Sequence, residues 1–137
     1  MANGSTSRAF PDWFVACCPP CDAADAECEV YRFVEKNPID PAEFRSYHET
    51  GERPTANPCQ RCGLSVFRNV EDVRAFLRHL WQNYPGKSYG PHIFKRNLTA
   101  NDGKIKPTGN YGHHTWWAFE RIERHASFVF VETVPRT

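Results

Sequence analysis

The cysteines are the residues whose spacing points most directly to chemistry. Two Cys-x-x-Cys pairs occur in the chain, "CPPC" at 18–21 and "CQRC" at 59–62. A two-residue spacer lets two thiolates reach one ion at the tetrahedral Zn–S distance of about 2.3 Å. The spacing therefore predicts a structural zinc ion, and ordinary buried thiols are the alternative. The predicted ligands are Cys18, Cys21, Cys59 and Cys62, with Cys17 or Cys28 able to replace Cys18.

The predicted zinc site agrees with the compartment that the sequence suggests. The N-terminal residues "MANGSTSRAFPDW" are polar and lack the apolar core of a signal peptide. No stretch approaches the ~20 apolar residues of a membrane span. We therefore expect a soluble cytoplasmic protein, in which six cysteines are more readily explained by metal binding than by disulfides. Structural zinc would contribute roughly 10 kcal/mol to folding.

The densest cluster of other reactive side chains is "GHHTWW" at 112–117. His113 and His114 follow the glycine-rich "TGNYG", so they begin a strand at the end of a loop, where catalytic side chains are common. A histidine can act as an acid, a base or a metal ligand near neutral pH. Because adjacent residues on a strand point to opposite faces, at most one of the two histidines should face any one site.

The element predicted most firmly is a helix from about Val70 to Tyr84. Asn69 can cap its first turn, and Pro85 follows its last turn. Apolar residues at helical spacing form one wide face of this helix. They are Val73, Phe76, Leu77, Leu80, Trp81 and Tyr84.

Several short segments have the composition of strands. They are 28–35, 64–67, 92–98, 114–122 and 127–134. The last two predict an antiparallel hairpin, and the apolar character of both faces of 127–134 predicts a central strand. The fold class is α+β: a mainly antiparallel sheet packed by one main helix. The length fits a single domain over 1–137, with a polar and cysteine-rich segment at 1–27 and the α+β body at 28–137.

The order of elements in the first half of the chain resembles that of a known family. "VYRFV" is followed by "EFRSYHE", then by "GLSVF" and a helix. This layout resembles the opening of ADP-ribosyltransferase-like domains, over roughly residues 28–80 and the last strand. In that family a strand carries an arginine or histidine that meets the phosphates of NAD, and a later strand carries a serine.

The resemblance implies a function and a set of site residues. Arg32 would bind the phosphates of an NAD-like ligand, Ser65 would be the strand serine, and Glu132 would orient the ribose. His113 or His114 would complete the site. The resemblance thus implies an enzyme that acts on NAD or another nucleotide, of the toxin or effector type.

A metal-independent ribonuclease is a second hypothesis. "ERIERH" at 120–125 contains glutamate, arginine and histidine, which suffice to cleave RNA. A base would take the 2′-hydroxyl proton, an acid would serve the leaving oxygen, and an arginine would stabilise the phosphate. This hypothesis requires Glu120 or Glu123 to share a face with a histidine.

A non-catalytic zinc-knuckle module that binds a protein or single-stranded nucleic acid is a third hypothesis. Residues 85–117 carry five basic side chains and one acidic side chain, a net charge of +4. An exposed Trp116 or Trp117 could add base stacking to this charge. Residues 1–52 carry four basic and ten acidic side chains (−6), whereas residues 53–137 carry thirteen and six (+7). Mutual attraction of the two parts within one fold is the simplest interpretation of that split.

Overall fold

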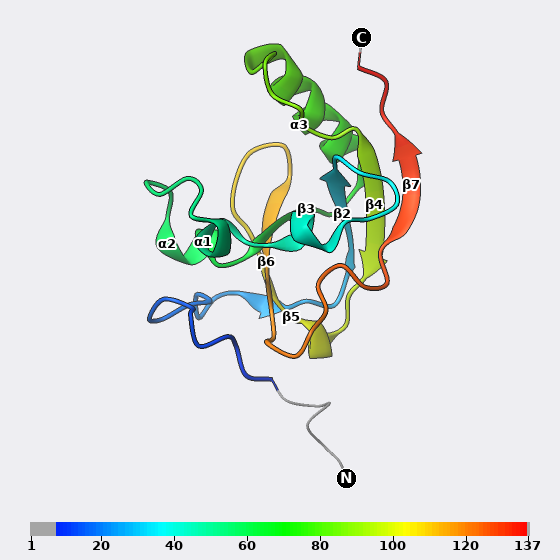
Figure 1. Cartoon of the computed structure of the whole chain (residues 1–137). Helices are drawn as coiled ribbons and strands as arrows, with labels where there is room; N and C mark the ends of the chain where they lie inside the picture. Colours follow the sequence, from blue (N-terminus) through cyan, green and yellow to red (C-terminus); the bar gives the residue numbers. More distant parts are fainter. Residues whose placement is uncertain (1–7, 137) are drawn as a thin grey trace.

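In the computed structural model, which describes residues 8–136, one antiparallel sheet organises the chain (Figure 1). The strand order is β1-β5-β6-β3-β2-β4-β7. The strands are β1 (Ala24–Asp25), β2 (Glu29–Val34), β3 (Leu64–Phe67), β4 (His92–Asn97), β5 (Gly103–Pro107), β6 (His113–Ala118) and β7 (Val129–Thr133). The helical elements are η2 (Pro41–Phe44), α1 (Tyr47–Thr50), α2 (Pro58–Arg61), α3 (Val70–Asn83) and η3 (Ala100–Asp102). The predicted α+β class with an antiparallel sheet is confirmed.

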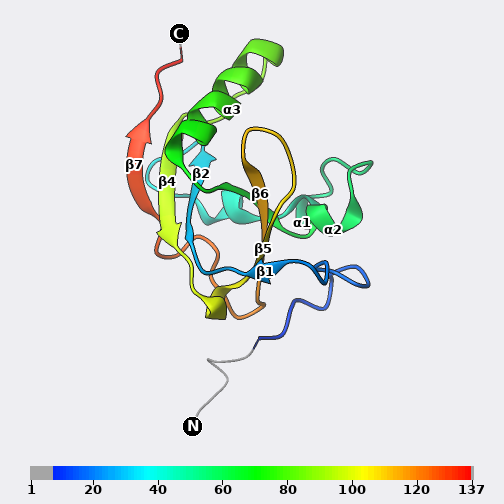
Figure 2. The same ribbon diagram turned by 180° about the vertical axis from the view of Figure 1, so that it is seen from behind.

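The main helix α3 is close to its predicted bounds and has the predicted cap. The Asn69 side chain accepts a hydrogen bond from the Asp72 amide, which satisfies one of the free N–H groups of the first turn. The buried side of α3 carries Val73 and Leu77 and packs against β2 and β3. Figure 2 shows the helix lying across one end of the sheet.

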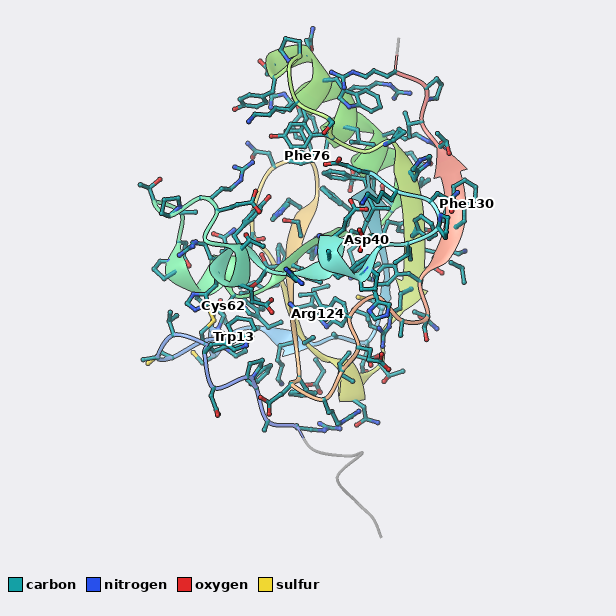
Figure 3. The ribbon with its side chains drawn as sticks, viewed as in Figure 1. Trp13, Asp40, Cys62, Phe76, Arg124 and Phe130 are labelled. Atoms are coloured by element: carbon teal, nitrogen blue, oxygen red, sulfur yellow. A yellow bond between two sulfur atoms is a disulfide. The ribbon has the colours of Figure 1, made fainter. Side chains whose placement is uncertain are left out.

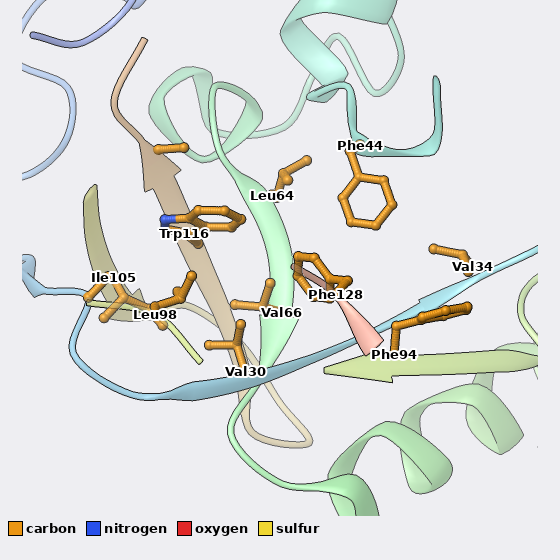
Figure 4. Close-up of a cluster of buried hydrophobic side chains, with 12 residues drawn as sticks. Val30, Val34, Phe44, Leu64, Val66, Phe94, Leu98, Ile105, Trp116 and Phe128 are labelled. Carbon is orange, nitrogen blue, oxygen red and sulfur yellow. The ribbon is translucent and has the colours of Figure 1, made fainter. Parts of the chain in front are cut away.

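A second apolar cluster lies on the other face of the sheet (Figure 4). Because alternate residues of a strand point to opposite faces, β2 and β3 supply side chains to both clusters. The cluster opposite α3 is closed by the segments around η2 and before β7. Its members include Val30, Val34, Phe44, Leu64, Val66, Phe94, Trp116 and Phe128.

The prediction of a C-terminal hairpin is wrong. β6 pairs with β3 and β5, whereas β7 pairs with β4 at the edge of the sheet. The apolar pattern of 127–134 suggested a central strand, yet Val129 and Phe130 are about half exposed, at 54% and 48%. An irregular segment separates β6 from β7, and Arg96 of β4 donates to its Glu123 and Ala126 carbonyls. These carbonyls therefore take no part in a hairpin between the two strands.

The prediction of structural zinc is also wrong. Cys18 and Cys59 form a disulfide, with their Cα atoms 5.4 Å apart. Cys21 is exposed and Cys62 is buried, so the four predicted ligands do not converge. Within residues 8–136, no group of three or more His, Cys, Asp and Glu side chains could hold a metal ion. The expectation that the cysteines form no disulfide falls with the zinc site.

The local geometry explains why the Cys-x-x-Cys spacing misleads here. α2 is one helical turn, and Cys62 follows it and turns into the protein. Cys62 lies beside the N-terminal segment that contains Trp13, and both residues are labelled in Figure 3. Burial raises the pKa of the Cys62 thiol, which opposes the thiolate that a metal would need. Only Cys59 is placed to meet the first cysteine-rich loop.

The opposite charges of the two parts of the chain attract each other within one fold, as predicted. Among residues 8–136, ion pairs join the acidic first part to the basic second part at four places. They are Asp22–Lys106, Asp25–Lys104, Glu29–Lys95 and Glu49–Arg124. No helix among the described residues combines the length and the apolar character that crossing a bilayer requires.

Candidate functional site

A cavity lined by charged and reactive side chains opens where β2 and β3 separate. These two strands form only one residue pair, Tyr31 with Phe67, whereas β2 pairs with β4 along six residues. The gap leads into a cavity of about 270 Å³. Its walls come from β2, β3, β6, α3 and the segment 45–61. Phe76 of α3, labelled in Figure 3, forms part of the apolar wall.

Arg32 fills the gap between the separated strands. Its guanidinium donates to the Ser65 carbonyl at 2.8 Å and to the Glu43 carbonyl at 2.6 Å. The bond to Ser65 links β2 to β3 where their ladder is missing, and the bond to Glu43 links β2 to η2. Arg32 Nε is buried without a hydrogen-bond partner in the described structure. Burial lowers the pKa of Arg32 to about 10, so the side chain remains charged at neutral pH.

Ser65 and His113 meet inside the cavity. His113 Nε2 lies 2.8 Å from Ser65 Oγ, and His113 Nδ1 lies 2.9 Å from Thr108 Oγ1. Thr108 Oγ1 in turn lies 2.8 Å from Thr115 Oγ1. The register explains the meeting, because Ser65 pairs with Thr115, two residues from His113 on the same face of β6. Four polar side chains therefore form one continuous network.

The environment of His113 favours its neutral form. Burial, and secondarily the nearby His114 and Arg32, lower the pKa of His113 to about 4. A neutral imidazole with one nitrogen facing a hydroxyl can accept the proton of that hydroxyl. At neutral pH the cavity therefore contains an unprotonated base beside Ser65.

The depressed pKa of His113 predicts a loss of stability in acid. The unfolded chain takes up a proton on this side chain near pH 6.5, whereas the folded chain resists it until about pH 4. We therefore expect the free energy of unfolding to fall by about 2–3 kcal/mol between these pH values. Urea unfolding of wild type and His113→Gln at pH 7, 5.5 and 4 measures this. The variant should lose less stability on acidification, and equal losses would contradict the prediction.

The cavity is strongly cationic. Arg32, Arg45, Arg53 and Arg61 line it, and no Asp or Glu side chain is among the described lining residues. Arg61 donates to the carbonyls of Glu52 and Tyr47. The Arg53 guanidinium lies 5.2 Å from the centre of the Tyr47 ring. Converging arginines without carboxylates are typical of a site for phosphate or another anion.

The structure brings together three of the five residues that the sequence analysis assigned to a nucleotide site. Arg32, Ser65 and His113 share the cavity. His114 points away and contacts the Gly112 carbonyl through Nδ1 at 2.7 Å. Glu132 lies on β7 and forms a bidentate ion pair with Arg74 of α3. Neither His114 nor Glu132 lines the cavity.

Other lining residues were not singled out from the sequence. Arg45, Arg53 and Arg61 lie on short helices and loops, which have no hydrophobic period that would assign them a direction. The one local signal is the capping box of α1. Ser46 accepts from the Glu49 amide, and the Glu49 carboxylate accepts from the Ser46 amide. This box fixes the turn that sets the direction of the arginine-bearing segment.

The residues of the other two hypotheses lie elsewhere. Glu120 and Glu123 make no hydrogen bond or ion pair with a histidine within residues 8–136. Trp116 and Trp117 are both 1% exposed, so neither offers a stacking surface. Their indole N–H groups donate to the Asp102 and Cys59 carbonyls.

Comparisons with known proteins give no relative from which a function could be inferred. No family model matches the chain, and neither the curated proteins nor the solved structures contain a significant match.

Proposed function

We propose that the chain is an enzyme that binds a phosphate-bearing nucleotide in the cavity between β2 and β3 and acts on it there. The observation that carries this proposal is the meeting of Arg32, Ser65 and His113 in one cavity with three further arginines and, among the described lining residues, no carboxylate. The layout that resembles ADP-ribosyltransferase-like domains supports NAD-like molecules as the first ligands to test.

The lining residues divide into a polar part and an apolar part that suit a nucleotide. Arg53 and Arg61 lie in the segment 45–61 and would bind phosphate oxygens through charge-assisted hydrogen bonds. Phe33, Phe76 and Tyr89 form the apolar part, against which a base or ribose could pack. The volume of about 270 Å³ is near the lower end for small-molecule sites, so a nucleotide would extend through the opening.

Arg32 has a different role from the other arginines. Both of its terminal nitrogens are already occupied by main-chain carbonyls. It would therefore attract the ligand through its charge while it holds the two strands apart at a fixed width. Replacing it would change the cavity itself, so Arg32 is a poor choice for a first binding variant.

Arg53 is a better test because its side chain is exposed and belongs to a loop. We expect the Arg53→Gln variant to bind ADP-ribose and AMP roughly tenfold more weakly than wild type, because one charge-assisted hydrogen bond is lost. Isothermal titration calorimetry measures both ligands, with adenosine as the ligand without phosphate. The matched control is Arg68→Gln, which removes an exposed arginine that does not line the cavity.

Two outcomes would overturn the proposed phosphate recognition. Adenosine could bind as tightly as AMP, or the Arg68→Gln variant could lose as much affinity as the Arg53→Gln variant.

Release of nicotinamide from NAD tests the reaction separately. Loss of that release in Ser65→Ala, with ADP-ribose binding retained, would assign the reaction to the same cavity.

A further inference from the structure

We propose that Ser65 is a nucleophile activated by His113, and that the cavity thereby transfers phosphoryl groups from phosphate esters to Ser65. This activity goes beyond nucleotide binding, since any phosphate ester that reaches Ser65 would serve. It rests on a base–nucleophile contact of 2.8 Å inside an arginine-lined cavity. An activated hydroxyl requires a base within hydrogen-bond reach and a third group that orients the base.

Thr108 is the third group. With the proton of His113 on Nδ1, the imidazole donates to Thr108 Oγ1, and Thr108 donates to Thr115. Nε2 is then free to accept from the Ser65 hydroxyl. In this tautomer each of the three contacts has one donor and one acceptor, and the base is directed at the nucleophile. Thr108 therefore takes the orienting place that a carboxylate holds in a Ser-His-Asp triad.

The position of Thr108 is itself held by a second element. Gln60 of α2 donates through Nε2 to the Thr108 carbonyl at 3.2 Å. The Thr108 amide also donates to the His113 carbonyl at 2.9 Å, which closes the turn that precedes β6. The loop 108–112 is thereby fixed at both ends next to the cavity. A base that is held in one orientation loses little entropy when the substrate arrives.

The proposed step is a balanced displacement. Ser65 Oγ attacks phosphorus while its proton passes to His113 Nε2, and the bond from phosphorus to the leaving oxygen breaks. The leaving oxygen takes the electron pair and then the proton from His113. Arg53 and Arg61 would stabilise the charge that develops on the other phosphate oxygens. Water then attacks the phosphoryl group on Ser65 and gives a proton to His113. The bond from phosphorus to Ser65 Oγ breaks, and His113 returns the proton to Ser65.

The covalent step can be tested with diisopropyl fluorophosphate, in which fluoride is the leaving group. We expect one adduct per chain, located by peptide mass spectrometry on Ser65. Ser65→Ala should abolish the adduct, whereas Ser88→Ala, which removes an exposed serine hydroxyl, should not. Turnover of bis(p-nitrophenyl) phosphate, followed as p-nitrophenolate release, should fall at least a hundredfold in Ser65→Ala.

The role of His113 has its own readouts. His113→Gln keeps a hydrogen-bonding group but accepts no proton, so labelling should slow at least a hundredfold. The wild-type rate should rise through about pH 4 and remain flat above pH 5, in line with the low pKa of His113. Thr108→Val should slow labelling about tenfold and move that rise in pH, which a purely structural role of Thr108 would not do.

The result that overturns the proposal is a folded protein without an adduct on Ser65, or with equal labelling in His113→Gln. If nucleotides bind but Ser65 forms no adduct, the proposed nucleotide-binding function stands and phosphoryl transfer to Ser65 is rejected. If Ser65 forms an adduct but nucleotides do not bind, phosphoryl transfer to Ser65 stands and the nucleotide-binding function is rejected. Circular dichroism of each variant shows that a lost adduct is not lost folding.

Discussion

Replacing Arg96 with methionine should lower the free energy of unfolding by about 3–5 kcal/mol, because it leaves a buried carboxylate unpaired. Arg96 is 8% exposed, and its NH2 group donates to Asp102 at 3.1 Å. Its NH1 group donates to the Glu123 and Ala126 carbonyls at 3.0 and 2.8 Å. The guanidinium also lies 5.4 Å from the centre of the Trp116 ring. One side chain thus fixes the turn before β7, η3 and part of the core.

Urea unfolding of Arg96→Met and Lys95→Met measures this effect with a matched control. Lys95 precedes Arg96 on β4, and its ammonium lies 3.6 Å from Glu29 with both side chains more than 40% exposed. Exposed ion pairs of this kind contribute about 0–1 kcal/mol. Similar losses in the two variants would show that the buried contacts of Arg96 are not the cause.

Breaking the Cys18–Cys59 disulfide should lower the free energy of unfolding by about 2–4 kcal/mol. The bond closes a loop between residues 41 positions apart, and this loop restricts the unfolded chain. The N-terminal segment should remain in place in the folded state. Phe10 packs on Phe119, with ring centres 4.8 Å apart, and Trp13 stacks on His48 at 5.3 Å. The loss should therefore come mainly from the unfolded state.

Cys59→Ser tests this prediction, and Cys21→Ser is its control because Cys21 is exposed and free. Both are unfolded in urea under non-reducing conditions. Thiol titration in denaturant should find four thiols before reduction, matching the four free cysteines, and six after it. Six thiols before reduction, or equal stability of the two variants, would contradict the disulfide.

The sequence predicted the helices and strands that are determined by residues close to them in the chain. Helix α3 has its period, its Asn69 cap and its stop within one segment, so its bounds follow from the sequence. The strands β2 and β3 were also predicted, because a short apolar run is a local property. Strand pairing was not, since the partner of β7 depends on contacts between distant segments such as Arg96 with residues 123–126.

The candidate site shows the same division. Arg32 and Ser65 were singled out because the order of the elements that carry them resembles that of ADP-ribosyltransferase-like domains, and His113 because it belongs to the cluster "GHHTWW". The arginines at 45, 53 and 61 were missed because they lie on short turns of irregular backbone. The cysteine spacing was a misleading signal, since it is compatible with metal binding, with free thiols and with a disulfide. Which of these occurs depends on where α2 meets the first loop.

The single residue pair between β2 and β3 has a thermodynamic consequence for any ligand of the cavity. On one side of this seam lie β1, β5, β6 and β3, and on the other lie β2, β4 and β7. A molecule bound in the gap touches both groups of strands and would act as a non-covalent cross-link across the weakest part of the sheet. Its binding free energy would add to the stability of the whole fold, by RT ln(1 + [L]/Kd). The melting temperature of this chain is therefore a sensitive detector of its own ligand.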